Sequence, residues 1–103
     1  MTGQLDIPID IPTDAIAAFC RRNHIRRLAL FGSVLRDDFR PDSDIDVLVE
    51  FEEGHTPGFR FVTIEDELAE ILHRKVDLNT PNSLSRYFRD RVLREAQDVY
   101  VAA

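Results

Sequence analysis

Residues 30–49 read LFGSVLRDDFRPDSDIDVLV, and this stretch decides the fold. From 45 to 51 apolar residues occupy every second position, and this period of two predicts a strand. Residues 26–31 predict a second strand that ends just before the Gly-Ser pair, and a short helical turn is expected over 33–38. Residues 40–43, Arg-Pro-Asp-Ser, have turn chemistry, because proline fixes φ and the Asp and Ser side chains bond their own backbone. The stretch therefore predicts two strands joined by a short, turn-rich connection.

The sequence on either side predicts helices and further strands. Thr13 is a suitable N-cap for a helix from Asp14 to about Asn23, which carries apolar residues on one side. Apolar residues recur at helical spacing from Phe61 to about His73. The remaining expected elements are a strand over 75–79, a helix start at Thr80-Pro81, an apolar helical stripe of Leu84, Tyr87, Phe88, Val92 and Ala96, and an edge strand over 99–101.

Length and composition indicate one small domain over 1–103, with an extended lead-in over 1–12. Proteins that bind nucleic acid usually neutralise its phosphates with basic side chains, and the formal net charge of −6 disfavours this kind of binding. No direct nucleic-acid binding is therefore expected. No charged-then-apolar leader opens the chain, and no apolar run approaches the ~20 residues of a membrane span. A soluble, cytoplasmic protein without membrane contact is therefore expected. The single cysteine, Cys20, is expected in the core.

Two groups of polar residues are interpreted first as surface features. Arginines gather over 21–27 and again over 86–94, where solvated helix faces balanced by nearby acids are the simpler interpretation. The alternative is a surface that contacts a partner or a nucleotide. His24, His55 and His73 lack metal-ligand spacing in the sequence and are interpreted as structural or surface residues.

Three aspartates are the candidate metal ligands. Asp44 and Asp46 project to the same side of the predicted strand, roughly 6–7 Å apart along the backbone. Two carboxylates in that position repel unless a cation lies between them, and Mg²⁺ binds carboxylates together with substrate phosphates and water. Asp77 would join them if its strand is a neighbour, either as a ligand of a second ion or as an acceptor of the attacking hydroxyl's proton.

The Gly32-Ser33 pair is the candidate phosphate site. It lies where a strand turns into a helix, and glycine would let a phosphate approach the backbone closely. The Ser33 hydroxyl and nearby backbone N–H groups could then bond phosphate oxygens, and Arg36 is within reach of the same place.

Two other site types fit the residues less well. Asp42, Asp44, Asp46 and Glu53 match positions of a calcium-binding EF-hand loop, but the sixth position, which needs glycine, is Val47 inside the predicted strand. A Ser-His-Asp hydrolase is not supported, because no serine has the sequence context of a nucleophile elbow.

The pattern of Gly-Ser, ten residues and Asp-x-Asp in an apolar strand resembles the signature of the polymerase-β-type nucleotidyltransferase superfamily. Within it, the sequence is most similar to the minimal nucleotidyltransferase (MNT) group, the antitoxins of HEPN–MNT toxin–antitoxin pairs. That group has an arginine four positions after its glycine, matched by Arg36, and a third acid in a Val-Asp-Leu strand, matched by Asp77. The chain departs from the group at Leu35 and Asp37, where members often have a small residue and glycine.

The resemblance implies an α+β fold, a small mixed and mostly antiparallel sheet with helices packed on one face. It implies transfer of AMP from ATP, with Mg²⁺, to a tyrosine hydroxyl of a partner HEPN toxin, and two Mg²⁺ ions are expected. Asp44 and Asp46 would be catalytic metal ligands, and Asp77 a third ligand and candidate base. Gly32 and Ser33 would hold the β- and γ-phosphates.

Alternatives to this activity stay open on the sequence alone. The chain could mask its toxin by stoichiometric binding without catalysis, or it could modify a small molecule. The short chain argues against a small-molecule acceptor, because such relatives resemble this core with a substrate-binding domain added. A homo- or hetero-oligomer is compatible with either role.

Overall fold

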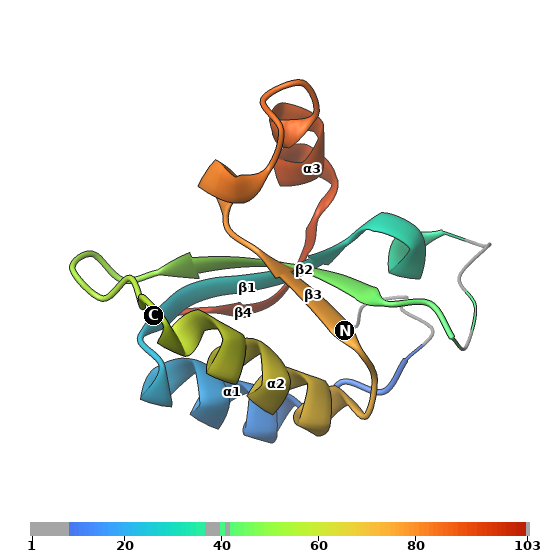
Figure 1. The fold of residues 1–103 in the computed structure, drawn as a ribbon. Coiled ribbons are helices and arrows are strands. Elements are labelled where there is room, and N and C mark those ends of the chain that lie inside the picture. The colour runs from blue at the N-terminus through green and yellow to red at the C-terminus, as the bar shows by residue number, and fades with distance from the viewer. Residues whose placement is uncertain (1–8, 37–39, 41, 103) are drawn as a thin grey trace.

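A four-stranded sheet organises the chain in the computed structural model, which describes residues 9–36, 40 and 42–102 (Figure 1). The strands are β1 (Ile25–Phe31), β2 (Ile45–Phe51), β3 (Val76–Asn79) and β4 (Gln97–Val101). They lie in the order β3-β2-β1-β4, with β1 antiparallel to both neighbours and β2 parallel to β3. In this part of the chain the helical elements are α1 (Thr13–Arg22), α2 (Arg60–Leu72), α3 (Arg89–Glu95) and the 3-10 turns η1 (Gly32–Leu35) and η2 (Pro81–Ser83). The expected α+β fold with a mixed, mostly antiparallel sheet is confirmed.

The main core lies between one face of the sheet and the helices α1 and α2 (Figure 1). Ile45, Val47 and Val49 of β2 have no exposed surface, and they cluster with Cys20 from α1 and Leu68 from α2. The period of two that predicted β2 therefore also selects its core residues. Cys20 is buried as expected, and burial raises the pKa of its thiol to about 12.

The opposite face of the sheet is only partly covered. Ala29 and Leu48 are fully buried in a second, smaller cluster with Leu84 and Val92 from the C-terminal segment. Figure 1 shows α3 on the side of the sheet opposite to α1 and α2. The expected packing on one face thus describes α1 and α2, whereas α3 covers part of the other. Asp46 lies two residues from Leu48 on β2, so its side chain belongs to the face where α3 lies.

The start of α1 differs from the expectation. Thr13 was expected to cap the helix, but it is the first helical residue, and Pro12 occupies the N-cap position without a side-chain cap. The backbone N–H of Ile16 donates to the Pro12 carbonyl at 2.9 Å, which begins the helical hydrogen-bond pattern one residue early. Proline suits this position, because its extended φ is fixed and its missing N–H would have had no helical partner.

The C-terminal segment begins as expected and then departs from its apolar pattern. Thr80 caps η2 with a reciprocal pair of bonds, in which the Ser83 N–H donates to the Thr80 hydroxyl and the Thr80 N–H donates to the Ser83 hydroxyl. The expected apolar stripe is wrong for Tyr87 and Phe88, whose relative exposures are 86% and 41%. The helical region is interrupted after η2, so these two residues do not lie on the buried face of α3, whereas Leu84 still packs in the cluster with Val92.

Part of the expected organisation falls outside the described residues. These include most of the lead-in over 1–12 and the positions of Asp37, Asp38 and Pro41. No helix in the described part of the chain combines the length and apolar character that crossing a bilayer requires.

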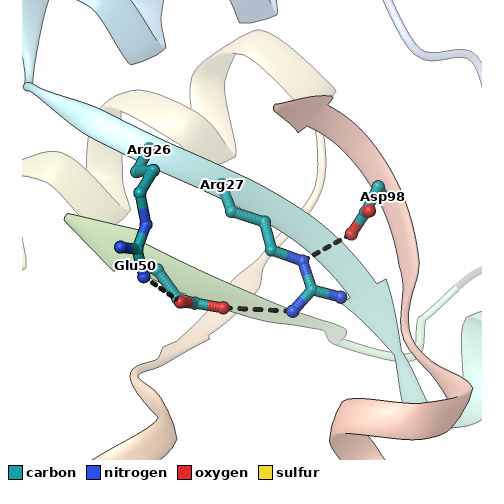
Figure 2. Close-up of polar contacts among 4 residues, drawn as sticks. All are labelled: Arg26, Arg27, Glu50 and Asp98. Carbon is teal, nitrogen blue, oxygen red and sulfur yellow. Dashed lines mark hydrogen bonds and ion pairs between the residues drawn. The ribbon is translucent and has the colours of Figure 1, made fainter. Parts of the chain in front are cut away.

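A network of charged side chains joins β1, β2 and β4 across the sheet (Figure 2). Glu50 of β2 accepts from Arg26 at 2.5 Å and from Arg27 at 3.0 Å, and Arg27 also donates to Asp98 of β4 at 2.6 Å. Arg26 and Arg27 of the first arginine group are therefore balanced by nearby acids, as interpreted, but they lie on strand β1 and not on a helix face. Burial opposes ionisation of Glu50, but the hydrogen bonds and charges of Arg26 and Arg27 outweigh it and lower the pKa of this carboxyl.

The lowered pKa of Glu50 predicts a pH-dependent contribution to folding. A carboxyl whose folded-state pKa is depressed stabilises the fold above its unfolded-state pKa, and this stabilisation is lost as the pH falls through the folded-state value. Replacing Glu50 with Gln should lower the urea midpoint at pH 7, and the difference from wild type should shrink below about pH 4. Glu53→Gln, at an exposed loop position, is the matched control and should change little at either pH. An equal loss at both pH values would contradict the assignment.

Candidate active site

The parallel pairing of β2 and β3 brings the predicted acids together. Asp46 and Asp77 are direct register partners on these neighbouring strands, so their side chains lie on the same face of the sheet. Asp44 comes immediately before β2 and is exposed, as is Asp77. The Leu78 N–H donates to the Glu65 carboxylate of α2 at 2.8 Å, which fixes β3 beside the core helix. Asp77 was expected to join the other acids only if its strand lies next to theirs, and β3 does lie next to β2.

The charge state of Asp46 shows that the three acids act on one another. Burial raises the pKa of its carboxyl above the ordinary value, and the negative charges of Asp77 and Asp44 raise it further. Arg36 acts in the opposite direction. Four of the predicted site residues therefore interact within one electrostatic cluster, and a cation near Asp46 would relieve the repulsion.

Gly32 makes room for Asp46. Its φ of +77° lies in the left-handed region, where glycine is favoured. A Cβ at this position would collide with the Asp46 carboxylate, whose Cγ would be 3.1 Å away. The close approach follows from the strand register, because Phe31 pairs directly with Asp46. The glycine is thus explained by the carboxylate itself, in addition to the phosphate approach for which it was predicted.

A hollow of about 280 Å³ opens beside this cluster. Its walls include Gly32, Ser33, Arg36 and Asp46, which are all predicted site residues. The C-terminal segment supplies the rest of the lining with Phe88, Arg91, Val92 and Glu95. An adjoining hollow shares Gly32 and Arg36 and adds Arg94. The lining thus combines carboxylates, which suit a divalent cation, with guanidinium groups, which suit a phosphate group.

Arg91 and Arg94 are the site residues that the sequence analysis did not single out. They belonged to an arginine group interpreted first as a solvated helix face, and both are exposed. Their spacing of three residues places them on one side of α3, and this was the available signal. The other members of the group differ, since Arg86 lies over the Tyr87 ring at 5.5 Å and Arg89 donates to the Leu84 carbonyl at 3.0 Å.

Comparison with known proteins shows the family of the chain. Residues 14–99 match the family described as Nucleotidyltransferase domain. The protein adenylyltransferase MntA of Thermococcus cleftensis is 40% identical over 78 residues, which cover 75% of each chain.

Solved structures show the same fold. A toxin–antitoxin crystal structure with AMP-PNP superposes with a TM-score of 0.70 at 22% identity, covering 89% of this chain and 75% of that chain. A Shewanella oneidensis complex of a tri-AMPylated HEPN toxin with its MNT antitoxin gives a TM-score of 0.62 at 23% identity, covering 87% and 70%.

The contact between Gly32 and Asp46 predicts a large effect of one added methyl group. Gly32→Ala should lose about 1–2 kcal/mol of folding free energy to backbone strain alone, and more because the Asp46 carboxylate must move. Gly54→Ala is the matched control, since Gly54 has a φ of +80° but nothing within 4 Å of the added Cβ. Urea denaturation of both variants measures the difference. Equal losses would show that Asp46 does not fill the space beside Gly32.

Repulsion among the acids predicts that the site lowers the stability of the metal-free fold. A raised carboxyl pKa means that ionisation is disfavoured in the folded state, so stability falls as the pH rises through that pKa. In EDTA at pH 7, Asp46→Asn should therefore raise the Tm by a few degrees. Asp66→Asn, an exposed position on α2, is the control and should leave the Tm nearly unchanged. A lower Tm for Asp46→Asn would contradict the assigned repulsion.

Proposed function

Because the chain belongs to the nucleotidyltransferase domain family, we propose that it is an antitoxin that transfers AMP from ATP to a tyrosine hydroxyl of a partner HEPN toxin. The observation that carries the proposal is the in-register pair of Asp46 and Asp77, which joins Asp44 and the Gly32-Ser33 hollow in one cluster. The adenylyltransferase relative and the fold shared with complexes of HEPN toxins support the choice of reaction and acceptor.

The acids are suited to Mg²⁺. Asp44, Asp46 and Asp77 offer only carboxylate oxygens, which Mg²⁺ prefers, and burial together with the charges of Asp77 and Asp44 raises the pKa of Asp46. These three residues would hold two ions, as expected from the sequence. When bound, Mg²⁺ neutralises phosphate charge and lowers the barrier to nucleotidyl transfer.

The remaining residues bind and orient the triphosphate in this proposal. Gly32 and Ser33 would hold the β- and γ-phosphates, with the Ser33 hydroxyl as a hydrogen-bond donor. Arg36 and Arg91, which line the same hollow, would add charge-assisted bonds to phosphate oxygens.

The transfer step requires one proton acceptor. The tyrosine oxygen forms a bond to the α-phosphorus, the bond from that phosphorus to the bridging oxygen breaks, and pyrophosphate leaves with the electron pair. Asp77 is the candidate base for the hydroxyl proton, because it is exposed on the open face of the sheet and is the register partner of Asp46.

A second candidate function is masking of the toxin by stoichiometric binding. The observation that favours it is that neighbours with this fold are complexes with their toxins. Catalysis and masking predict different behaviour when the acids are removed while the fold is kept.

Intact-mass analysis of the toxin after co-expression tests the proposal. With the wild-type chain the toxin should gain one or more AMP units on tyrosine. The gain should vanish with Asp44→Ala/Asp46→Ala and persist with the control Asp66→Ala, at an exposed position on α2. Unmodified toxin that is still neutralised by wild type and by the double variant would overturn catalysis and establish masking.

A further inference from the structure

The structure gathers two histidines and a glutamate that lie far apart in the sequence. His24 follows α1, whereas Glu52 and His55 lie in the loop between β2 and α2. One potential ligand atom from each side chain lies within 4.8 Å of the other two. The sequence analysis found no metal-ligand spacing for these histidines, because 24 and 55 become neighbours only through the pairing of β1 with β2.

Backbone hydrogen bonds hold the three residues in place. The Glu52 N–H donates to the His24 carbonyl at 2.8 Å, and the His55 N–H donates to the Glu52 carbonyl at 3.0 Å. The two imidazole rings stack with their centroids 4.0 Å apart, and His24 Nδ1 lies 3.7 Å from Glu52 Oε1. The cluster is thus already assembled by the fold, while its side chains stay exposed and free to adjust.

The donor set matches a borderline-soft divalent cation. Two imidazoles and one carboxylate form a common protein contribution to a zinc site, and solvent completes the tetrahedron. Donor atoms that each lie about 2.1 Å from zinc are about 3.4 Å apart, so the three donor atoms must draw closer together. The stacked imidazole rings must also rotate until their nitrogen lone pairs point at one ion, which exposed side chains can do. Mg²⁺ prefers oxygen donors and is disfavoured by two nitrogen ligands.

We propose that His24, Glu52 and His55 form a binding site for zinc or a similar transition-metal ion, separate from the acids. Glu52 follows Asp46 by six residues along an extended strand, a separation of about 20 Å. Figure 1 shows the α1–β1 junction and the β2–α2 loop at the end of the sheet away from η1. A bound ion would cross-link that junction to that loop and stabilise the fold by its binding free energy.

Calorimetric titration of the full chain with ZnCl₂ at pH 7.5, in excess MgCl₂ to occupy the acids, tests the proposal. One zinc ion should bind per chain, and the Tm should rise by about 5 °C or more at saturation. His24→Asn and His55→Gln should each weaken binding at least about tenfold, since even outer-shell losses cost roughly 10- to 100-fold.

A matched control separates the cluster from a general effect of losing histidine. His24 and His73 both have a φ of +56°, a left-handed conformation that asparagine tolerates, so His73→Asn repeats the same change away from the cluster. His73→Asn should bind zinc as wild type does, and all three variants should keep the circular-dichroism spectrum of the fold. Binding that persists in both cluster variants, or is lost equally in His73→Asn, would overturn the proposal. So would the absence of binding to wild type.

Discussion

The parallel register between β2 and β3 is the constraint from which the site follows. It sets Asp46 directly opposite Asp77, and Asp44 enters from the start of β2, so like charges are forced together. The sheet can carry this unfavourable group because alternate residues of the same strand, Ile45 and Val47, are fully buried on the other face. Packing with α1 and α2 supplies stability on one side, and the acids use the exposed side.

The second consequence of that register is the glycine. Since Phe31 pairs with Asp46, the residue after Phe31 must leave space for a carboxylate and turn the chain at positive φ. Gly32 satisfies both needs, and the turn that follows places Ser33 on the wall of the hollow. Arg91 then reaches the same hollow from α3, so negative and positive groups face a common space.

Local pattern was sufficient to predict β2, and motif spacing singled out Gly32 and Asp46, which the β1–β2 register places side by side. Asp77 comes beside them only through the pairing of β2 with β3. The local sequence around Asp46 does not show this pairing, because the helix between two parallel strands sets which strands become partners. The capping role of Thr13 was predicted wrongly, since Pro12 could take the N-cap position in its place. The sequence left two interpretations of Arg91 open, a solvated helix face or a contact surface, because the other walls of its hollow belong to elements distant in sequence.

The two ends of β2 are chemically distinct and electrostatically independent. Oxygen donors gather at one end and imidazole nitrogens near the other, so ligand type alone would direct different ions to each. Their separation of about 20 Å exceeds the Debye length of ~8 Å at physiological salt, so a charge bound at one end is largely screened from the other. The ends are connected instead through the buried residues of β2 between them. Any influence of His24 and His55 on the acids must therefore act through the rigidity of the sheet and not through charge.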